Sequence, residues 1–438
     1  MKYHIWTEGC QMNVADSERI SRSLESLGLE QTRQPDQADV ILLNTCVVRQ
    51  SAEDKALGRL NSLKPLKQAN PNLTIALMGC LVGVQGNQAL QKRFPWVDVF
   101  AAPSDPTPLL DHLRNRFDSP DSEDWRKKID LALDEEFGIS SPSGDREVSE
   151  NLPIVLGCSH ACAYCVIPHR RGKERSRDAS KILSEAHQMV AEGVKEIVLL
   201  GQIIDRYGLD LANSPHLPEL LGMLNDIPDL KRIRFLTSHP NWMTSELIDK
   251  VATLTKVMPH IEVPIQAGDD EILKSMRRGT TNKQYRELVA NIRERIPGVS
   301  IGTDIIVGFP GESEAAFQAT YDLLEDLKLD VAHLARYSPR PNTYSAMYLP
   351  DDIPATEKMR RFRALENLQE GIVTEINKKF LGETQSVLFE AKSKNRWRGR
   401  TPTNRLVFAE SDENLRGQER PVKITWTGPW TLIGDLTG

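Results

Sequence analysis

Short apolar runs alternate with longer amphipathic stretches along the first part of the chain. Three runs have the length and composition of buried strands, at Tyr3–Trp6, Asp39–Leu43 and Leu73–Met78. Residues 13–27 and 51–60 place apolar side chains three or four positions apart, which is the spacing of one helix face. Because strands that alternate with helices favour a parallel sheet, we expect residues 1–118 to form an α/β domain.

Residues 119–150 interrupt this alternation because they are rich in Ser, Pro, Asp and Glu, and we expect them to form a linker. The alternation returns at residue 151, where six further strand patterns begin. They lie at Pro153–Leu156, Glu196–Leu200, Arg232–Leu236, Ile261–Ile265, Val299–Val307 and Val331–Ala335. Helical patterns separate them, so residues 151–376 are expected to form an open (β/α)6 barrel, two repeats short of the usual eight.

The pattern changes again near the C-terminus. A charged amphipathic helix is expected over Glu357–Phe380, where it would close the barrel. Four short alternating strands follow, at Val387–Glu390, Arg405–Phe408, Val422–Thr427 and Trp430–Ile433. Residues 377–438 are therefore expected to form a small β-barrel, and the whole chain to be an α/β multidomain protein.

Composition narrows the class of protein. The chain has 438 residues, a formal net charge of −6 and six cysteines. No apolar run reaches the roughly 18 residues that cross a bilayer, and the N-terminus lacks the apolar core of a signal peptide. We therefore expect a soluble protein of the cytoplasm. Thiols stay reduced there, so the cysteines are better interpreted as metal ligands than as disulfides.

Three cysteines occur within eight residues, at Cys158, Cys162 and Cys165, in the spacing C-x3-C-x2-C. They follow the first strand pattern of the barrel, at the end where barrel enzymes place their sites. Structural zinc sites close with four protein ligands, whereas three thiolates on a cubane iron–sulfur cluster leave one iron open. A Cys3His zinc site with His160 or His169, and three buried cysteines on one helix face, stay open as alternatives.

The other three cysteines, Cys10, Cys46 and Cys80, each follow a predicted strand of the first domain. Ligands of open α/β sheets bind at this edge, so we expect the three thiols to meet. The alternative is three unrelated buried thiols. Six cysteines thus form two groups of three, and each group would leave one iron of a cubane cluster open.

Polar residues follow the other strands of the barrel, among them Gln202, Gln266, Asp304 and Arg336. Arg336 would anchor an anionic group or form a surface ion pair. Two basic segments are candidate RNA contacts, and solvated surface charge is the alternative for both. The first contains Arg170, Arg171, Arg175 and Arg177, and the second contains Lys394, Arg396, Trp397, Arg398 and Arg400.

Together these motifs resemble the radical S-adenosylmethionine (SAM) methylthiotransferase family over nearly the whole chain. The resemblance is carried by Gly9–Asn13 with Asp16 and Ser17, Asn44–Cys46 with Arg49, Gly79–Cys80, Leu156–Arg177, Asp304–Glu312 and Tyr337–Pro341. Within the family, the sequence is most similar to the branch that acts on N6-dimethylallyladenosine in tRNA. The resemblance implies an N-terminal three-cysteine domain, a radical SAM core and a C-terminal TRAM domain.

The resemblance also implies the chemistry, with a 4Fe–4S cluster on each triad and two SAM molecules per product. One SAM would methylate a sulfur species on the Cys10/Cys46/Cys80 cluster. The other would bind the second cluster and yield a 5′-deoxyadenosyl radical, which takes hydrogen from carbon 2 of the modified adenine 3′ of the anticodon. The carbon radical would then collect the methylthio group. Expected SAM contacts are Tyr164, Gln202, Gln266, Asp304 and Arg336.

The implied partners are a tRNA anticodon stem-loop and a low-potential electron donor such as flavodoxin or ferredoxin. We expect a monomer without a membrane anchor, and the sequence does not identify the sulfur donor. The chain departs from the family pattern at Leu81–Gly83, Ile203–Arg206, Ala267 and Asn342. Alternative functions are methylthiolation of threonylcarbamoyladenosine in tRNA, methylthiolation of a ribosomal-protein aspartate, and zinc-dependent RNA binding without catalysis.

Overall fold

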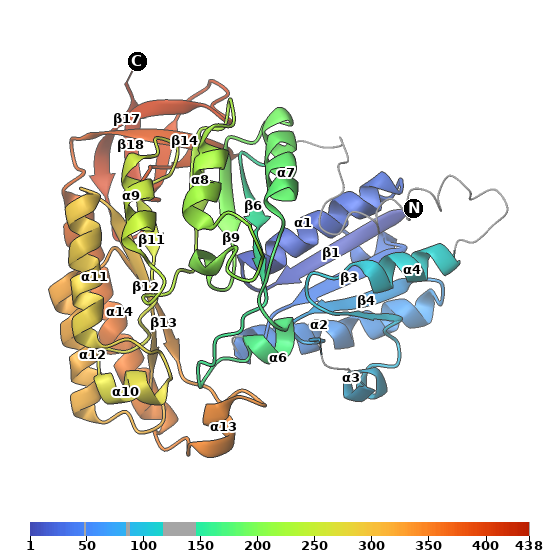
Figure 1. The fold of residues 1–438 in the computed structure, drawn as a ribbon. Coiled ribbons are helices and arrows are strands. Elements are labelled where there is room, and N and C mark those ends of the chain that lie inside the picture. Colours follow the sequence, from blue (N-terminus) through green and yellow to red (C-terminus); the bar gives the residue numbers. More distant parts are fainter. Residues whose placement is uncertain (48–49, 85–87, 117–145, 438) are drawn as a thin grey trace. The chain divides into compact units, whose positions relative to one another are not determined.

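The computed structural model describes residues 1–47, 50–84, 88–116 and 146–437 (Figure 1). The fold divides into two compact units. The first unit comprises residues 1–145, 156–160 and 165–175, and the second comprises residues 146–155, 161–164 and 176–438. Most of the expected linker 119–150 lies outside the described residues, and the domain boundaries stay predictions.

The first unit is a parallel sheet with helices on both faces. Its strands are β1 (Lys2–Glu8), β2 (Glu30–Gln31), β3 (Val40–Thr45), β4 (Thr74–Gly79) and β5 (Val99–Ala101), in the order β2-β1-β3-β4-β5. Its helices are α1 (Gln11–Ser26), η1 (Pro35–Gln37), α2 (Gln50–Ala69), α3 (Gln88–Arg93) and α4 (Thr107–Arg116). Alternate side chains of β3 enter opposite cores: Leu42 packs with α1 and α4, whereas Leu43 packs with α2. Both faces of the sheet are therefore buried, as expected for a parallel sheet.

The register of this sheet aligns the ends of its central strands. Glu8 of β1 lies opposite Thr45 of β3, and Thr45 lies opposite Gly79 of β4. The residues that follow these strands therefore leave the sheet at the same edge.

The second unit contains six parallel strands in two three-stranded sheets. The first sheet is formed by β6 (Ser149–Pro153), β9 (Glu196–Leu200) and β10 (Arg232–Phe235), and the second by β11 (His260–Glu262), β12 (Ser300–Val307) and β13 (Val331–Arg336). Backbone hydrogen bonds bridge the sheets, from Ser238 N–H to the Glu262 carbonyl and from Met258 N–H to the Ile233 carbonyl. The expected open six-stranded barrel is confirmed. Its first strand begins earlier than Pro153, and β7 (Val155–Leu156) pairs instead with β8 (Arg175–Ser176).

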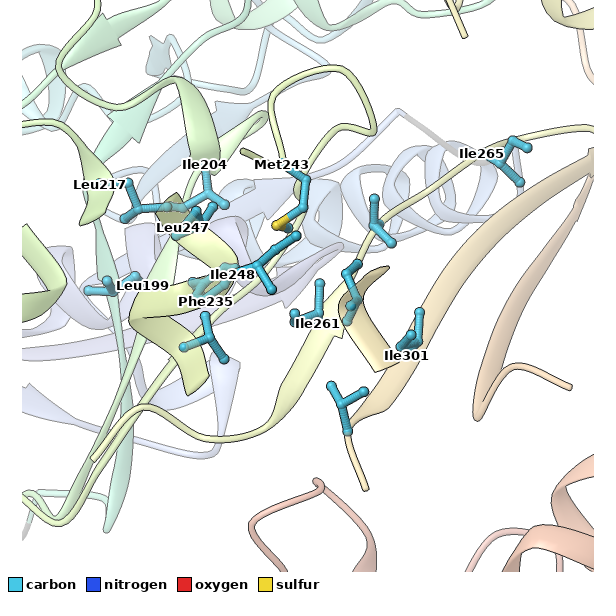
Figure 2. Close-up of a cluster of buried hydrophobic side chains, with 14 of the residues drawn as sticks. Leu199, Ile204, Leu217, Phe235, Met243, Leu247, Ile248, Ile261, Ile265 and Ile301 are labelled. Atoms are coloured by element: carbon cyan, nitrogen blue, oxygen red, sulfur yellow. The ribbon is translucent and has the colours of Figure 1, made fainter. Parts of the chain in front are cut away.

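Helices cover the outside of the barrel strands. They are α7 (Ala179–Ala191), α8 (Leu217–Asn225), α9 (Ser245–Thr253), α10 (Asp270–Ser275), α11 (Asn282–Arg295), α12 (Glu314–Leu327) and α14 (Ala355–Lys378). Shorter turns of this unit are η2 (Ile204–Arg206) and α13 (Tyr344–Tyr348), whereas α6 (Ile167–Arg171) belongs to the first unit. Figure 2 shows how strand residues such as Leu199, Phe235 and Ile261 pack with helix residues such as Leu247 and Ile248.

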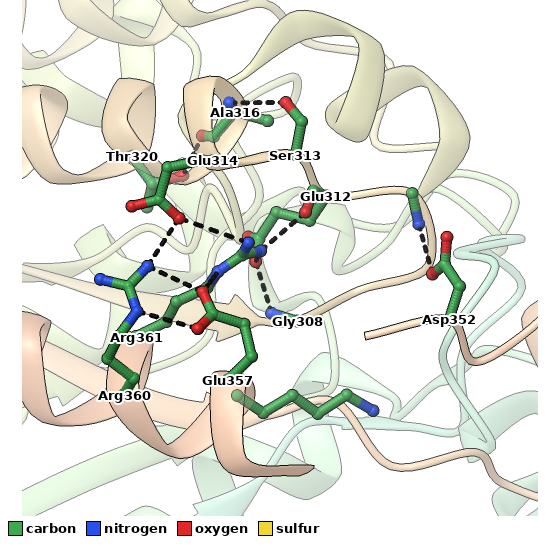
Figure 3. A network of polar contacts seen from close by, with 12 residues as sticks. Gly308, Glu312, Ser313, Glu314, Ala316, Thr320, Asp352, Glu357, Arg360 and Arg361 are labelled. Carbon is green, nitrogen blue, oxygen red and sulfur yellow. Dashed lines mark hydrogen bonds and ion pairs between the residues drawn. The ribbon is translucent and has the colours of Figure 1, made fainter. Parts of the chain in front are cut away.

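Helix α14 fixes the turn that follows β12. Arg361 donates to the Glu312 carboxylate at 2.6 Å, and the same carboxylate accepts the Gly308 N–H at 2.6 Å (Figure 3). Glu312 is almost fully buried, and burial raises its pKa although Arg361 lowers it. A buried carboxylate with two partners can hold its turn rigidly, so this network positions the loop between β12 and α12.

The C-terminal segment is a closed five-stranded barrel, as expected. It consists of β14 (Thr384–Ser393), β15 (Arg396–Arg400), β16 (Leu406–Glu410), β17 (Glu419–Thr427) and β18 (Leu432–Leu436), in the order β14-β15-β16-β18-β17. Four strands were expected from the sequence, and β15 is the strand missing from that prediction. Closure removes the unpaired edges that an open sheet would expose.

The small barrel docks at the N-terminal ends of the core strands. Arg234 of β10 pairs with Glu196 of β9 at 2.9 Å and donates to the carbonyls of Thr401 and Pro402 at 2.8 Å each. Arg232 donates to the Arg400 carbonyl at 2.7 Å. These buried, charge-assisted bonds attach the turn between β15 and β16 to the end of the core opposite its C-terminal mouth.

Candidate functional site

The thiols of Cys10, Cys46 and Cys80 meet at the sheet edge of the first unit. Cys46 and Cys80 directly follow β3 and β4. Cys10 lies two residues after the end of β1 and is also the N-cap of α1. Gly79 has φ +100°, and a Cβ there would lie 2.4 Å from the Thr45 carbonyl oxygen. Only glycine fits where β4 approaches β3 so closely.

Two asparagines hold this edge together. Asn13 Nδ2 donates to Asn44 Oδ1 at 2.9 Å and to the Thr45 carbonyl at 3.0 Å. Asn44 Nδ2 donates in return to the Asn13 carbonyl at 2.8 Å. The Cys10 thiol donates to Asn13 Oδ1 at 3.2 Å. Both asparagines are fully buried, so these bonds satisfy polar groups that would otherwise be costly to bury.

Hydrogen bonds link the three thiols. The bond with Cys46 is the largest cause that lowers the pKa of Cys10 to about 6 and that of Cys80 to about 7, and the charge of Arg171 contributes to both shifts against the effect of burial. The same bonds raise the pKa of Cys46, because its proton is shared with two neighbours that favour the thiolate. The thiolate is the form that binds iron. The donor chemistry of this triad therefore fits an iron–sulfur cluster.

Among the described residues, no group of three or more His, Cys, Asp or Glu side chains is arranged to hold a single metal ion. A cubane cluster gives each thiolate a different iron, so its ligands need not surround a single ion. The triad is therefore assigned to a cluster because its three thiols lie at one sheet edge and are linked by hydrogen bonds.

Two arginines of the first basic segment do not lie where RNA could contact them. Arg171 is buried in the first unit beside Asp16, Cys10 and Cys80. Arg177 is buried in the second unit, where it pairs with Glu185 at 2.6 Å and donates to the Pro153 carbonyl at 2.7 Å. Their expected role as RNA contacts is therefore wrong, because neither guanidinium reaches the surface. Arg170 is half-buried and Arg175 is exposed.

The second cysteine loop is fixed by backbone contacts. Gly157 has φ +68°, and a Cβ there would lie 2.2 Å from the Lys173 carbonyl oxygen, so this position requires glycine. Cys158 N–H donates to the Gly172 carbonyl at 3.1 Å, and both residues lie in the first unit with Cys165.

Cys162 and Tyr164 lie in the second unit. The Cys162 thiol accepts a hydrogen bond from Arg278 Nη1 at 3.3 Å, and Ala163 N–H donates to the Met276 carbonyl at 2.9 Å. Tyr164 is half-buried against the core of the unit. Arg278 was not among the residues selected from the sequence, and its hydrogen bond helps to fix the position of the Cys162 thiol.

Polar residues gather at the C-terminal mouth of the second unit. Gln266 has φ +88° and is buried, and its backbone N–H donates to the Asp304 carbonyl at 2.9 Å. The structure thus brings Gln266 and Asp304 together, while Gln202 is half-buried after β9 and Arg336 is exposed at the end of β13.

Asp205 is a further candidate at this mouth. It follows β9 in η2, and its Oδ2 accepts the His239 N–H at 2.9 Å. Burial raises the pKa of Asp205 to about 7, although this hydrogen bond opposes the shift. The sequence held a signal for this residue, because Asp205 is a charged residue that follows two isoleucines, Ile203 and Ile204, just after a strand. Carboxylates with such shifted pKa values often occur at functional sites.

Trp397 is placed differently from the expectation. It was expected on an RNA-binding surface, but its ring lies in the core of the small barrel and only 6% of the residue is exposed. A base therefore cannot stack on it. The exposed aromatic residues of this barrel are Trp426 and Trp430, at 50% and 61%, which the sequence analysis did not select. Lys394, Arg396 and Arg398 are exposed, and Arg400 is half-buried.

Comparison with known proteins agrees with the fold. Residues 2–102 match the family model described as "Uncharacterized protein family UPF0004", and residues 152–324 match the Radical SAM superfamily. The radical SAM methyltransferase TsrM from Kitasatospora setae, with tryptophan and a SAM analogue bound, aligns with a TM-score of 0.57 at 14% identity over 88% of this chain and 78% of that one. The cobalamin-dependent radical enzyme OxsB gives a TM-score of 0.51 at 13% identity over 84% of this chain and 56% of that one. The fold and the three-cysteine loop together define a radical SAM protein.

Curated relatives match almost the whole chain. The tRNA-2-methylthio-N(6)-dimethylallyladenosine synthase of Roseiflexus sp. (strain RS-1) is 46% identical over 440 residues, covering 99% of this chain and 89% of the relative. Enzymes with the same name from Chloroflexus aurantiacus and Dehalococcoides mccartyi (strain CBDB1) are 45% and 44% identical over 99% of this chain, covering 91% and 98% of their own lengths. The chain belongs to the family of tRNA-2-methylthio-N(6)-dimethylallyladenosine synthases.

The raised pKa of Asp205 predicts a pH-dependent stability. In the folded chain this carboxyl group keeps its proton up to about pH 7, whereas in the unfolded chain it loses the proton near pH 4. Its contribution to the free energy of unfolding is fully present below about pH 4 and is lost as the pH rises through about 7. Asp205→Asn, which has no proton to lose, should therefore gain stability relative to the parent as the pH rises.

Urea unfolding of the parent and of Asp205→Asn between about pH 5 and about pH 8 measures this difference. Asp326→Asn, which removes an exposed carboxylate of α12, is the control. A difference between parent and Asp205→Asn that stays constant across this range would contradict the assignment.

Proposed function

We propose that this chain converts N6-dimethylallyladenosine, at the tRNA position 3′ of the anticodon, to its 2-methylthio derivative. The observation that carries the proposal is the 44–46% identity to enzymes named for this product along 99% of the chain. The polar scaffold around the first thiol triad supports it, because it brings together three thiols whose donor chemistry fits a second cluster.

The radical SAM family implies SAM and one 4Fe–4S cluster. We propose that Cys158, Cys162 and Cys165 hold this cluster and leave one iron open for SAM. We further propose that Cys10, Cys46 and Cys80 hold a second 4Fe–4S cluster, which carries the sulfur species. When bound, the first of these clusters would supply the electron that cleaves SAM, and the second would supply the methylthio group for carbon 2 of the adenine.

Side chains at the mouth of the second unit would then orient the reactants. Arg278 holds the Cys162 thiol, and the Arg361–Glu312 pair fixes the turn after β12. Tyr164, Gln202, Gln266, Asp304 and Arg336 are the proposed SAM contacts.

The small C-terminal barrel is the proposed RNA-binding module and corresponds to the expected TRAM domain. Lys394, Arg396 and Arg398 present exposed cationic groups, and the exposed rings of Trp426 and Trp430 provide apolar surfaces for bases. Cationic side chains that follow the phosphate backbone, together with aromatic rings that stack on bases, are the usual means of binding single-stranded RNA.

A low-potential donor such as flavodoxin or ferredoxin would supply the electron for SAM cleavage. The described residues contain no helix long and apolar enough to span a membrane. We propose that the protein acts on tRNA in the cytoplasm as a monomer.

Replacing one cysteine in each triad tests the two cluster assignments. Cys46→Ala should still cleave SAM to 5′-deoxyadenosine but form no methylthio nucleoside, because only the second cluster site is lost. Cys162→Ala should form neither product. An anaerobic assay with SAM, reductant and dimethylallylated tRNA measures both products by mass spectrometry. Each variant is the control for the other, and methylthio product from Cys46→Ala would refute the proposal.

The RNA-binding surface is tested by the salt dependence of affinity. Arg398→Gln removes one exposed cation, so the slope of log affinity for tRNA against log salt concentration should fall by about one. Trp430→Ala should weaken binding with little change in slope, because stacking is not electrostatic. Arg295→Gln, on helix α11 of the core, should leave both quantities unchanged. Equal slopes for Arg398→Gln and the parent would exclude this residue from the surface.

A further inference from the structure

Arg171 brings a buried positive charge to the first thiol triad. It lies at the end of α6, six positions after Cys165 in the sequence, and only 3% of its side chain is exposed. Its Nη1 lies 3.4 Å from Asp16 Oδ2 and 3.3 Å from Ser104 Oγ, and its Nη2 lies 3.5 Å from Asn13 Oδ1. The same Asn13 oxygen accepts the Cys10 thiol, so the guanidinium and the thiol share one acceptor.

The protein partners of this guanidinium are few for a buried charge. Its contacts to Asp16, Ser104 and Asn13 are all long, and its Nε has no hydrogen-bond partner among the described residues. Asp16 is itself fully buried and also accepts Ser104 Oγ at 2.6 Å. Burying an arginine is costly unless nearby negative charge compensates it.

The thiols supply the remaining compensation. The Arg171 guanidinium forms a side-chain hydrogen bond with the Cys80 thiol. Asn13 Oδ1 accepts both Arg171 Nη2 and the Cys10 thiol, so this oxygen links the guanidinium to Cys10 as well. The three thiolates of a bound cluster would add negative charge at this edge, and the positive charge of Arg171 would balance part of it.

We propose that Arg171 is the counter-ion and positioning residue of the cluster on Cys10, Cys46 and Cys80, where its charge raises the reduction potential of that cluster. This inference rests on the proposed second cluster. It gives Arg171 a role in sulfur insertion that is separate from RNA binding. Net charge and hydrogen bonds to the sulfurs are the means by which proteins set cluster potentials.

A structural ion pair between Arg171 and Asp16 is the competing explanation, and charge substitutions separate the two. Loss of the cation in Arg171→Gln disfavours an added electron, so the potential should become more negative. Loss of the neighbouring anion in Asp16→Asn leaves the cation less balanced, so the potential should become less negative. Damage to the fold would not shift the two variants in opposite directions.

The experiment uses the full chain with Cys158, Cys162 and Cys165 replaced by alanine, so that one cluster site remains. After anaerobic reconstitution, iron is counted and the potential is measured by a redox titration followed by electron paramagnetic resonance. Arg171→Lys keeps the charge but not the planar fork, and should retain a potential near that of the parent. Arg114→Gln, which removes an exposed cation of α4, should have no effect.

The outcomes distinguish the inference from the proposed function. A parent without iron would refute the second cluster itself. A parent with iron, whose potential is equal in Arg171→Gln and Asp16→Asn or shifts in one direction in both, would overturn the inference alone. If Arg171→Gln binds no iron, its potential cannot be measured, and the inference is then tested by Arg171→Lys and Asp16→Asn. Iron binding by Arg171→Lys with a less negative potential in Asp16→Asn supports the inference, and any other result overturns it.

Discussion

The buried exchange of hydrogen bonds between Asn13 and Asn44 is the constraint on which the first thiol triad depends. It links the start of α1 to the end of β3, and the bond from Asn13 to the Thr45 carbonyl extends the link to the residue before Cys46. Parallel pairing in register then brings the end of β4 to the same edge. Three cysteines that are more than thirty residues apart in sequence thereby share one site.

Charge balance gives the same edge its chemical character. Thiolates are the form that binds iron, and a buried thiolate is stabilised by a nearby positive charge. Arg171 provides this positive charge beside the first triad. The residue comes from the helix that follows the second cysteine loop, so a segment of the radical SAM motif also serves the first triad. In the second unit, Arg278 has a comparable relation to Cys162. Arginine beside thiol is thus a feature of both candidate cluster sites.

Much of the fold followed from local pattern, because strand ends and cysteine spacing are properties of the sequence itself. The strand at Glu196–Leu200 was predicted with its observed bounds, and the helix expected over Glu357–Phe380 is α14, Ala355–Lys378. Burial of charge could not be predicted in this way, since it depends on partners distant in sequence: Arg171 meets Asp16, and Arg177 meets Glu185. Trp397 is a different case. Its alternation with Arg396 and Arg398 already indicated a strand with the ring turned inward, as β15 shows.

The central claim is that one chain carries two thiolate-held cubane clusters. Mössbauer spectroscopy of the full-length protein, reconstituted anaerobically with iron-57 and sulfide, tests it most directly. The account predicts about eight irons per chain, all in quadrupole doublets typical of 4Fe–4S clusters. A spectrum that accounts for about four irons in a single cubane, with the protein otherwise folded, would contradict it.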